Sequence, residues 1–371
     1  MFDEIVRWSG TARQVSRSGQ VLRVDLGGEA VDIHCPAPER AGSALLALTG
    51  SSTHFEGLRA LAAGRGWTLT ADGLTRGHGL DEIASSEADI YAALDLPFVP
   101  PEIREGPDAL IAATRNELPT LVEAPDIRGD LHMHSSWSDG RDSVEAMVQS
   151  AIALGYEYVA ITDHSQRAGA ARTLQVGDVS RQADEIAALR ERYRQITILH
   201  GCEVDIMPDG RLDFTDQTLE RFDIVLASLH DPAGQSPERL LARYIDAMRH
   251  PLVSIVTHPS NRLVPHRPGY EIDYGRLFAA AVETETALEI DGGPTHLDLD
   301  SGLARLAIAA GATVSIDSDA HRSEFLGRQM FLGLLTARRA WVEPQQVLNT
   351  RPIQDVLQRV HTKRSCRRAD D

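Results

Sequence analysis

Apolar residues follow two different spacings along the chain, and the change comes near residue 126. Before it, QVLRVDLGG and EAVDIHC alternate apolar and polar positions on either side of a Gly-Gly pair, which predicts a small antiparallel sheet within residues 1–38. From Ala41 to Arg65 the apolar residues recur at helical spacing with a break at Gly50, which predicts two helices. The proline-rich, charged segment 97–107 predicts a linker or an extended arm.

After residue 126, short β-branched runs alternate with amphipathic helical segments. The runs span residues 128–134, 158–164, 196–206, 222–230, 253–259, 287–293 and 312–321. Strands that alternate with helices indicate a parallel sheet. Seven such units in under 200 residues predict an α/β fold, a closed or nearly closed β/α barrel of the TIM-like kind.

The two patterns predict four regions. A small α+β domain covers residues 1–96, and a linker or arm covers 97–125. The barrel covers 126–345, and residues 346–371 form a C-terminal tail. Length alone already favours two domains, because 371 residues exceed the usual size of one.

Metal-binding residue types stand where almost every apolar run of the barrel ends. In a β/α barrel these strand ends meet at one face, so ligands that are far apart in sequence would meet in space. Residues two apart on a strand also share a face, which pairs His132 with His134 and Asp319 with His321. The predicted metal ligands are His132, His134, Asp139, His164, Glu203, His230, His258, Asp319 and His321.

This donor set predicts more than one ion. Nitrogen and oxygen donors without thiolates suit Zn, Mn or Fe, and nine donors are too many for one ion, so we expect two or three divalent metal ions. Three divalent ions against three carboxylates leave an excess of about three positive charges, which favours a phosphate dianion. We therefore expect a metal-activated water to hydrolyse phosphate esters, with His132, His134, Glu203 and Asp319 in the catalytic centre.

Several neighbours of these residues receive lesser roles. Arg262 is expected to reach a substrate phosphate as a further catalytic residue, and Arg267 is a weaker candidate. Asp163 is expected to orient an imidazole or to cap a strand, while Asp130 and Asp317 are expected to support the ligands. Four histidines, at positions 200, 250, 266 and 296, are expected to lie outside the centre. Asp291 is the one strand end to which the sequence assigns no role.

Composition limits the partners. A formal net charge of -17 disfavours a nonspecific grip on nucleic-acid phosphates. Three cysteines and no signal-like or membrane-spanning stretch predict a cytoplasmic protein with no membrane partner, and no obligate protein partner is evident. The single lysine, Lys363, excludes a Walker A lysine in the main body.

The motifs DLHMHSSWSDG, ITDHS, HGCEVDI, LASLH, THPSNR, LEID and SDAH together resemble the PHP family, the polymerase and histidinol phosphatase domain. The resemblance covers about residues 126–345 and implies a distorted seven-stranded barrel with a trinuclear metal site that hydrolyses phosphoesters. The nine predicted ligands fall on the family's ligand positions. Asp291 stands where asparagine is usual, and NR replaces GR after HPS.

Within that family the chain is most similar to the C-terminal domain of bacterial family X DNA polymerases. LTGSSTHFEGLRALAAGRGWTL and DLPFVPPEIRE resemble the palm and thumb that precede it. Asp32 resembles the third polymerase carboxylate, while the strand that carries the other two is missing, so we expect no polymerase activity. The resemblance implies a 3'-5' exonuclease or 3'-phosphatase, with single-stranded DNA or nucleic-acid ends as partners.

Three other functions compete with that expectation. The first is a phosphatase for small phosphomonoesters, similar to histidinol phosphatase; it gains support because residues 1–125 hold 10 Arg against 18 Asp and Glu. The second is an amidohydrolase, which would need a bridging lysine that only Lys363 could supply. The third is a silent scaffold, which the intact ligand set disfavours.

Overall fold

The computed structural model describes residues 13–76, 86–170 and 172–366, and it divides into two compact units, Met1–Leu118 and Pro119–Asp371. The first unit begins with the antiparallel strands β1 (Arg13–Ser18), β2 (Val21–Leu26) and β3 (Glu29–His34). The Gly27–Gly28 turn joins β2 to β3 with positive φ values of 68° and 100°, which glycine adopts without steric cost. The predicted sheet within residues 1–38 is confirmed.

Helices form the rest of the first unit around a short hairpin. Helices α2 (Ala41–Thr49) and α3 (Ser52–Gly64) confirm the two predicted helices, and Ser51 caps α3 by accepting a hydrogen bond from the His54 amide. Strands β4 (Trp67–Thr70) and β5 (Gly73–Arg76) pair with each other, and α4 (Glu87–Ala93) and α5 (Asp108–Arg115) follow.

The expected linker at 97–125 is mostly part of the first unit. Arg104 is almost fully buried, and its guanidinium binds Glu87 at 2.5 Å, Thr49 Oγ1 at 2.9 Å and the Val99 carbonyl at 3.0 Å. Helix α5 lies in the same segment, and the division between the units follows Leu118. The proline-rich, charged segment is therefore a packed turn and not a linker. The sequence pattern could not show this, because Arg104 is buried by groups that are distant in sequence.

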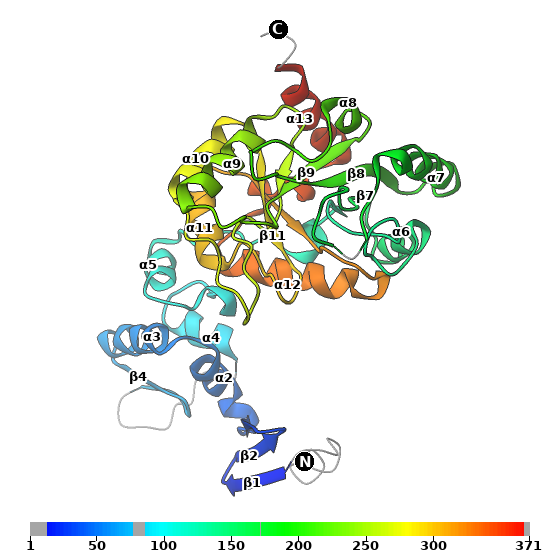
Figure 1. Ribbon diagram of the computed structural model, residues 1–371. Helices are drawn as coiled ribbons and strands as arrows, with labels where there is room; N and C mark the ends of the chain where they lie inside the picture. Colours follow the sequence, from blue (N-terminus) through cyan, green and yellow to red (C-terminus); the bar gives the residue numbers. More distant parts are fainter. Residues whose placement is uncertain (1–12, 77–85, 171, 367–371) are drawn as a thin grey trace. The chain divides into compact units, whose positions relative to one another are not determined.

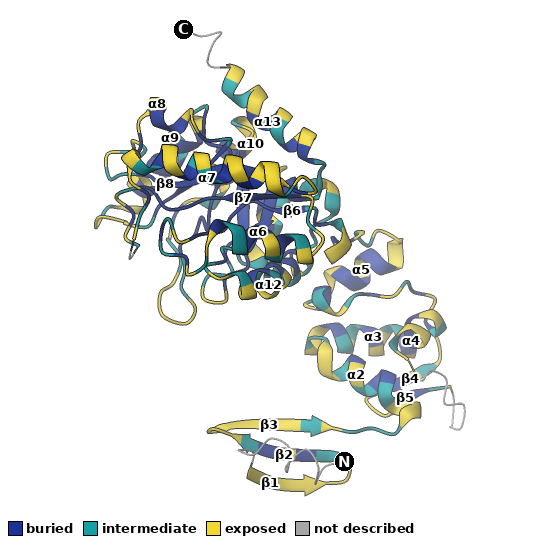
Figure 2. Ribbon diagram, turned by 90° about the vertical axis from the view of Figure 1, so that its right-hand side faces the viewer, coloured by how far each residue is buried: buried dark blue, intermediate teal, exposed yellow. Residues whose placement is uncertain are grey.

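The second unit is the predicted barrel (Figure 1). Over residues 119–170 and 172–366, seven parallel strands lie side by side in chain order: β6 (Gly129–Asp130), β7 (Tyr158–Ile161), β8 (Thr197–Asp205), β9 (Ile224–Ser228), β10 (Ile255–Val256), β11 (Ala287–Asp291) and β12 (Val314–Asp317). Between them run α6 (Val144–Ala153), α7 (Val179–Arg192), α8 (Asp216–Leu219), α9 (Pro237–Arg249), α10 (Tyr274–Glu283) and α11 (Ser301–Ala309), and α12 (Leu326–Arg339) follows β12. Figure 2 shows that these helices present exposed residues outward and buried residues to the strands.

Polar groups close the seam between the two end strands, β6 and β12. The Leu131 amide donates to Asp317 Oδ1 at 2.8 Å, and the Ser318 amide donates to Asp130 Oδ1 at 3.2 Å. Asn349, fully buried, spans the seam by donating to the carbonyls of Gly129 and Ile316. The expected supporting role of Asp130 and Asp317 is thus structural, because they join two strands instead of binding imidazoles.

The expected C-terminal tail is part of the barrel. Helix α13 (Ile353–Cys366) packs Val356 and Val360 into the same apolar cluster as Leu131, Tyr158 and other residues of the strands. Its apolar positions four residues apart give it a face that can be buried against the barrel. Within the described residues, no helix combines the length and the apolar content that a membrane crossing requires.

Candidate metal centre

The first ligand segment follows β6 and is held by Asp163. This fully buried carboxylate accepts hydrogen bonds from the amide and hydroxyl of Ser135, the amide and hydroxyl of Ser138, and the amide of the Gln182 side chain, at 2.5 to 3.1 Å. Asp163 therefore fixes the turn that carries Asp139, and the expectation that it orients an imidazole is wrong. Gly140 is required there, since a Cβ would come within 2.7 Å of the His134 backbone.

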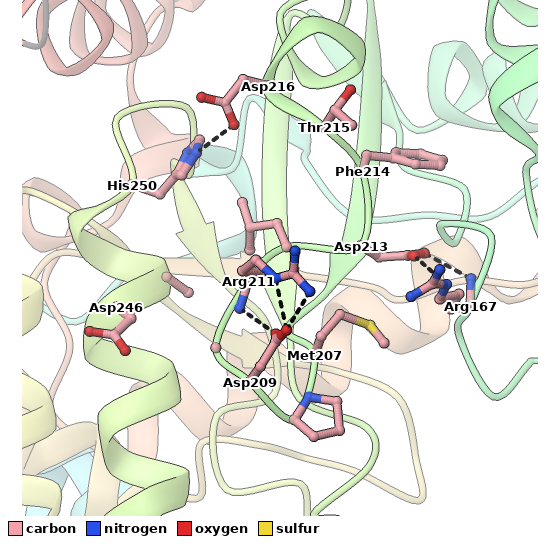
Figure 3. Close-up of a pocket in the computed structure, with 14 residues that line it drawn as sticks. Arg167, Met207, Asp209, Arg211, Asp213, Phe214, Thr215, Asp216, Asp246 and His250 are labelled. Atoms are coloured by element: carbon pink, nitrogen blue, oxygen red, sulfur yellow. Dashed lines mark hydrogen bonds and ion pairs between the residues drawn. The ribbon is translucent and has the colours of Figure 1, made fainter.

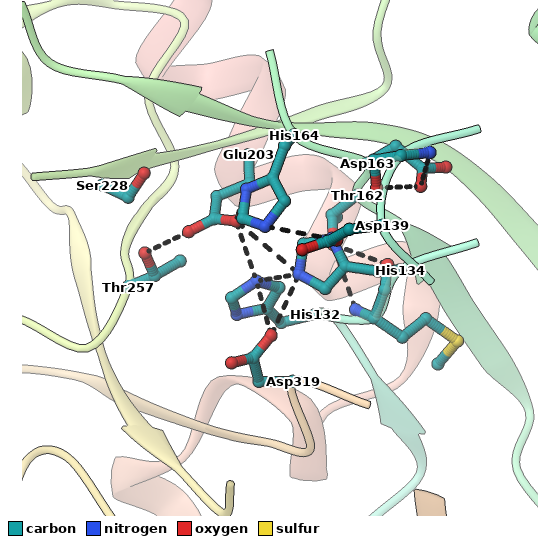
Figure 4. A network of polar contacts seen from close by, with 12 residues as sticks. His132, His134, Asp139, Thr162, Asp163, His164, Glu203, Ser228, Thr257 and Asp319 are labelled. Atoms are coloured by element: carbon teal, nitrogen blue, oxygen red, sulfur yellow. Dashed lines mark hydrogen bonds and ion pairs between the residues drawn. The ribbon is translucent and has the colours of Figure 1, made fainter. Parts of the chain in front are cut away.

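Glu203 lies at the centre of the imidazoles (Figure 4). It is fully buried on β8, and its Oε2 lies 2.7 Å from His164 Nδ1 and 3.5 Å from His132 Nε2. Its Oε1 lies 3.0 Å from His258 Nε2 and 3.4 Å from His230 Nε2. One carboxylate thus reaches imidazoles that follow four different strands.

Asp319 and Asp139 form the other two acidic positions. Asp319 Oδ1 lies 2.9 Å from His134 Nε2 and 3.5 Å from His132 Nε2. Asp139 Oδ1 lies 3.2 Å from His321 Nε2 and 3.6 Å from His164 Nε2. The rings of His134 and His321 are 4.3 Å apart between centroids. All nine side chains predicted from the strand ends therefore gather in one place.

The sequence reasoning missed two carboxylates that support this cluster. Glu289 accepts the Nδ1 proton of His132 at 2.6 Å and the backbone amide of His258 at 2.7 Å. Asp205 Oδ1 lies 2.8 Å from His230 Nδ1. Both bonds leave the Nε2 atom of the imidazole facing the cluster, which is how a ligand histidine is usually oriented. Strand alternation was the available signal, because Asp205 lies two residues after Glu203 and Glu289 two before Asp291.

Several short contacts within the cluster are not hydrogen bonds. His164 Nδ1 and Glu203 Oε2 approach to 2.7 Å, yet neither atom has a hydrogen-bond partner, and the same is true of Asp139 Oδ1, His134 Nδ1 and His258 Nδ1. Buried polar atoms without partners are costly. Donor atoms from three overlapping groups of these residues lie within 4.8 Å of one another: His134, Asp139, His164 and His321; His132, His134 and Asp319; His164, Glu203 and His230. The donor chemistry and the unsatisfied atoms fit divalent metal ions.

Electrostatics couple these groups strongly. Burial raises the pKa of Glu203, but the imidazoles of His164, His230 and His132 outweigh it and hold that pKa well below its usual value. Burial lowers the pKa of His230, but Glu203 and Asp205 outweigh it and raise that pKa to about 10. In the same way, burial lowers the pKa of His321, but the carboxylates of Asp139 and Asp319 outweigh it and raise that pKa to about 9. Without metal, protons on these imidazoles supply the positive charge that the carboxylates need.

The pKa of His134 is shifted downward, unlike those of His230 and His321. Burial and the neighbouring imidazoles of His164 and His321 lower it to about 3. Burial and then the charges of Asp319 and Glu289 raise the pKa of Asp291 well above its usual value. The expected surplus of about three positive charges counted three carboxylates, and it left out the buried Asp205, Glu289 and Asp291, each of which lowers the surplus when it is ionised.

Two residues of the cluster have strained backbones. Asp319 has φ of +49° and His258 has φ of +26°, values that residues other than glycine seldom adopt. Such strain costs on the order of 1 to 3 kcal/mol and is common where a side chain must be aimed. The fold therefore holds these two residues in place at a cost to its stability.

The arginines expected at the phosphate are engaged elsewhere. Arg262 donates to the carbonyls of His296 and Leu297 and to Asp300, and Arg267 binds the backbone and side chain of Asn261. Among the hydrogen bonds and ion pairs of the described residues, none joins either guanidinium to the nine residues. The role expected for Arg262 thus lacks structural support, because the loops after β10 and β11 use its donors.

Four histidines were expected outside the centre. His200 binds Gln182 and His250 binds Asp216, while His266 is exposed. His296 was placed wrongly, because its ring stacks on His258 with centroids 5.1 Å apart.

A separate cavity of about 740 Å³ lies beside the hairpin after β8 (Figure 3). None of the nine residues lines it. Its charges pair within the cavity wall, with Asp209 bound to Arg211 at 2.6 Å and Asp216 to His250 at 3.2 Å. Volume alone therefore does not identify the chemical centre of this barrel.

Comparisons with known proteins match both units. The family model for the PHP domain matches residues 130–284, and the model for the DNA polymerase beta thumb matches residues 44–105. A "DNA polymerase/3'-5' exonuclease PolX" of Bacillus subtilis (strain 168) is 39% identical over 327 residues, which are 88% of this chain and 57% of that protein. The chain thus spans little more than half the length of this relative.

Two further relatives match the barrel. A "Probable phosphatase" of Thermoanaerobacter sp. (strain X514) is 30% identical over 234 residues, which are 60% of this chain and 89% of that protein. The solved structure of histidinol phosphate phosphatase from Lactococcus lactis, complexed with zinc, L-histidinol and phosphate, is 19% identical with a TM-score of 0.45. It covers 57% of this chain and 93% of that one.

Proposed function

We propose that this chain, which belongs to the PHP family, is a metal-dependent phosphoesterase whose catalytic centre is the nine-residue cluster. The observation that carries the proposal is that nitrogen and oxygen donors from five strand ends form three overlapping groups, with the donor atoms of each group within 4.8 Å of one another. Two or three divalent ions, of Zn, Mn or Fe, suit this donor set. When bound, they would supply a water of lowered pKa and stabilise charge on the phosphoryl oxygens.

The residues of the chain would prepare this centre in three ways. Glu289 holds the proton of His132 on Nδ1, and Asp205 does the same for His230, so both imidazoles offer Nε2 to a metal. Glu203 directs one oxygen toward His164 and the other toward His258, which suits a carboxylate shared between two ions. Asp163 fixes the turn of Asp139, so this ligand needs no reordering on binding.

We propose nucleic-acid 3' ends as the substrate, through 3'-5' exonuclease or 3'-phosphatase action. Two findings support this choice: the relationship to a protein named as a 3'-5' exonuclease over 88% of this chain, and the thumb match at residues 44–105. The net charge of -17 argues against broad electrostatic capture of DNA, so binding would be confined to the metal centre and its surroundings.

A small phosphomonoester is the second candidate substrate. It is favoured by the phosphatase-named relative, of which the barrel covers 89%. An amidohydrolase has weaker support, because the bridging lysine it needs could only be Lys363, and this lysine lies away from the cluster. Lys363 donates to the Met248 carbonyl and to Thr286, the residue just before β11. The metal cluster lies at the other end of that strand.

We further propose that this chain does not incorporate nucleotides. Asp32, the residue that resembles a polymerase carboxylate, forms a two-point ion pair with Arg23 at 2.6 and 2.5 Å. A single exposed carboxylate that is paired with an arginine does not by itself hold the two ions of nucleotide transfer.

The test presents metal-loaded protein with two substrates in parallel: 3'-labelled single-stranded DNA and a panel of small phosphomonoesters. Shortened DNA, or phosphate released from a 3'-phosphorylated end, supports the first candidate, and phosphate released only from the small esters supports the second. A primer-extension assay with the same protein should give no product, and extension would contradict the proposal about Asp32.

His132→Ala and His321→Ala provide the variants for this test, and His361→Ala on the exposed face of α13 is the matched histidine control. We expect both cluster variants to lose the activity and the control to keep it. Circular dichroism confirms that each variant is folded. Full turnover in both cluster variants would exclude the metal mechanism.

A further inference from the structure

A second group of donors lies beside the nine-residue cluster and includes two residues outside it. One ligand atom each from Asp291, His296 and Asp319 lies within 4.8 Å of the others. Asp291 ends β11, and His296 belongs to the loop that follows. Asp319 follows β12 and also contacts His134. The two groups thus share one carboxylate.

The carboxylate of Asp291 is fully buried and only half satisfied. Its Oδ1 accepts one hydrogen bond, from the Gly293 amide at 2.5 Å. Its Oδ2 has no hydrogen-bond partner, and the same holds for Nδ1 of His296. A buried carboxylate without enough donors costs several kcal/mol unless a cation or a proton compensates it. Two unsatisfied donor atoms on neighbouring side chains point to one shared ligand.

The loop that carries His296 is tightly fixed. A Cβ on Gly292 would collide with the carbonyl oxygen of Gln329 on α12, so this position admits only glycine. The His296 amide donates to the Gly293 carbonyl at 2.9 Å, and its ring stacks on His258 with an interplanar angle of 26°. The imidazole is therefore held beside Asp291 by the backbone and by the cluster itself.

The other nearby carboxylate is already engaged. Glu289 uses one oxygen for His132 and the other for the His258 amide, so it has no free oxygen with which to satisfy His296. The arginine of the adjacent loop, Arg262, donates to the carbonyls of His296 and Leu297 and to Asp300. No described basic side chain offers its charge to Asp291 through a hydrogen bond.

We propose that Asp291, His296 and Asp319 bind one further divalent cation, adjacent to the main centre and sharing Asp319 with it. Two carboxylates and one imidazole suit Mn²⁺, Fe²⁺ or Zn²⁺, and water would complete the coordination. A cation at this position would account for the acid at Asp291, because an asparagine would supply no negative charge. This site goes beyond the proposed function, since Asp291 and His296 lie outside the nine residues and only Asp319 is common to both groups.

Metal content and crystallography test this site without an activity assay. The parent protein and the variants Asp291→Asn and His296→Ala are saturated with Mn²⁺, freed of unbound metal by gel filtration, and measured for Mn per chain. His266→Ala, an exposed histidine of the neighbouring loop, is the matched control. We expect each of the two variants to hold one ion fewer than the parent, and the control to equal the parent.

An anomalous difference map of parent crystals at the Mn edge locates the ions directly. We expect a peak bonded to both Asp291 and His296, separate from those at the nine residues. Equal metal content in all four proteins, or a map with peaks only among the nine residues, would overturn the proposal. If a variant fails to fold, the parent map alone decides. Hydrolysis could persist in either case, so this outcome and that of the substrate test are distinguishable.

Discussion

Asp163, just after β7, and Glu203, on the neighbouring strand β8, are two buried carboxylates of one barrel with different surroundings. Five N–H and O–H groups donate to Asp163, so its charge is neutralised by the fold itself. Glu203 instead faces five imidazoles, and its Oε2 has no hydrogen-bond partner. Asp163, with both oxygens satisfied, therefore holds a turn, whereas Glu203, which faces imidazoles and has one oxygen without a donor, is placed to bind a ligand.

The largest effect is expected at the open carboxylate. Glu203→Gln keeps the shape of the side chain but removes the charge that two metal ions would share. We expect metal affinity and phosphate release to fall by more than about 100-fold. Calorimetric metal titration and a phosphate-release assay measure the two quantities. The melting temperature of the parent should rise on metal addition, and that of the variant should not.

The satisfied carboxylate should respond in the opposite way. Asp163→Asn removes the negative charge on which five donors converge and turns one acceptor into a donor. We expect a loss of about 3 kcal/mol in the free energy of unfolding, and a smaller loss of metal affinity than in Glu203→Gln, because only the turn that carries Asp139 is loosened. Urea denaturation in the presence of a chelator measures it. Asp184→Asn, at an exposed position of α7, is the control and should cost less than about 0.5 kcal/mol. Similar stability losses in Glu203→Gln and Asp163→Asn, with similar metal losses, would contradict the distinction between the two carboxylates.

The stability of the metal-free protein should depend on pH through the imidazoles. The folded-state pKa values of His230, about 10, and His321, about 9, lie above the unfolded value of about 6.5. Their stabilising charge is therefore fully present below about pH 6.5 and is lost as the pH rises through 9 and 10. We expect the melting temperature in chelator to fall across this range.

Metal binding should show the reverse trend, because metal ligands must be neutral imidazoles and binding releases their protons. Affinity should therefore increase with pH over the same window, and calorimetry in buffers of different ionisation enthalpy would count the protons. Melting curves that run parallel with and without metal would show that these histidines do not bind it.

The smallest effect is expected at Arg262, the residue whose catalytic role the structure does not support. Because its guanidinium donates to loop carbonyls and to Asp300, Arg262→Ala should cost about 1 kcal/mol of stability and change kcat/KM by less than about threefold. Steady-state kinetics on whichever ester proves active measure this. A hundredfold loss carried entirely by kcat would restore the arginine to the reaction.

Sequence patterning located the barrel and the cluster because both depend on local, repeated signals. Residues two apart on a strand share a face, which places His132 with His134 and Asp319 with His321. The parallel strands of a barrel then bring these faces together at one end. The same alternation would have found Glu289 and Asp205 if it had been applied to every acid on β8 and β11.

Other features depend on contacts that no local pattern encodes. Arg104 is buried because Thr49, Val99 and Glu87 meet around it. The loop after β11 brings His296 to His258, and the stacking of the two rings follows from that tertiary placement. The C-terminal helix is an intermediate case, since Val356 and Val360 signalled an apolar face but not the strands that would cover it.

Removal and return of metal is the measurement that bears most directly on the nine-residue centre. The protein is stripped with a chelator until it holds less than about 0.1 metal ion per chain, and it is then assayed for phosphoester hydrolysis before and after Mn²⁺ or Zn²⁺ is restored. The proposed centre predicts no turnover in the stripped protein and recovery as the second and third equivalents bind. Full turnover by the stripped, folded protein would contradict it.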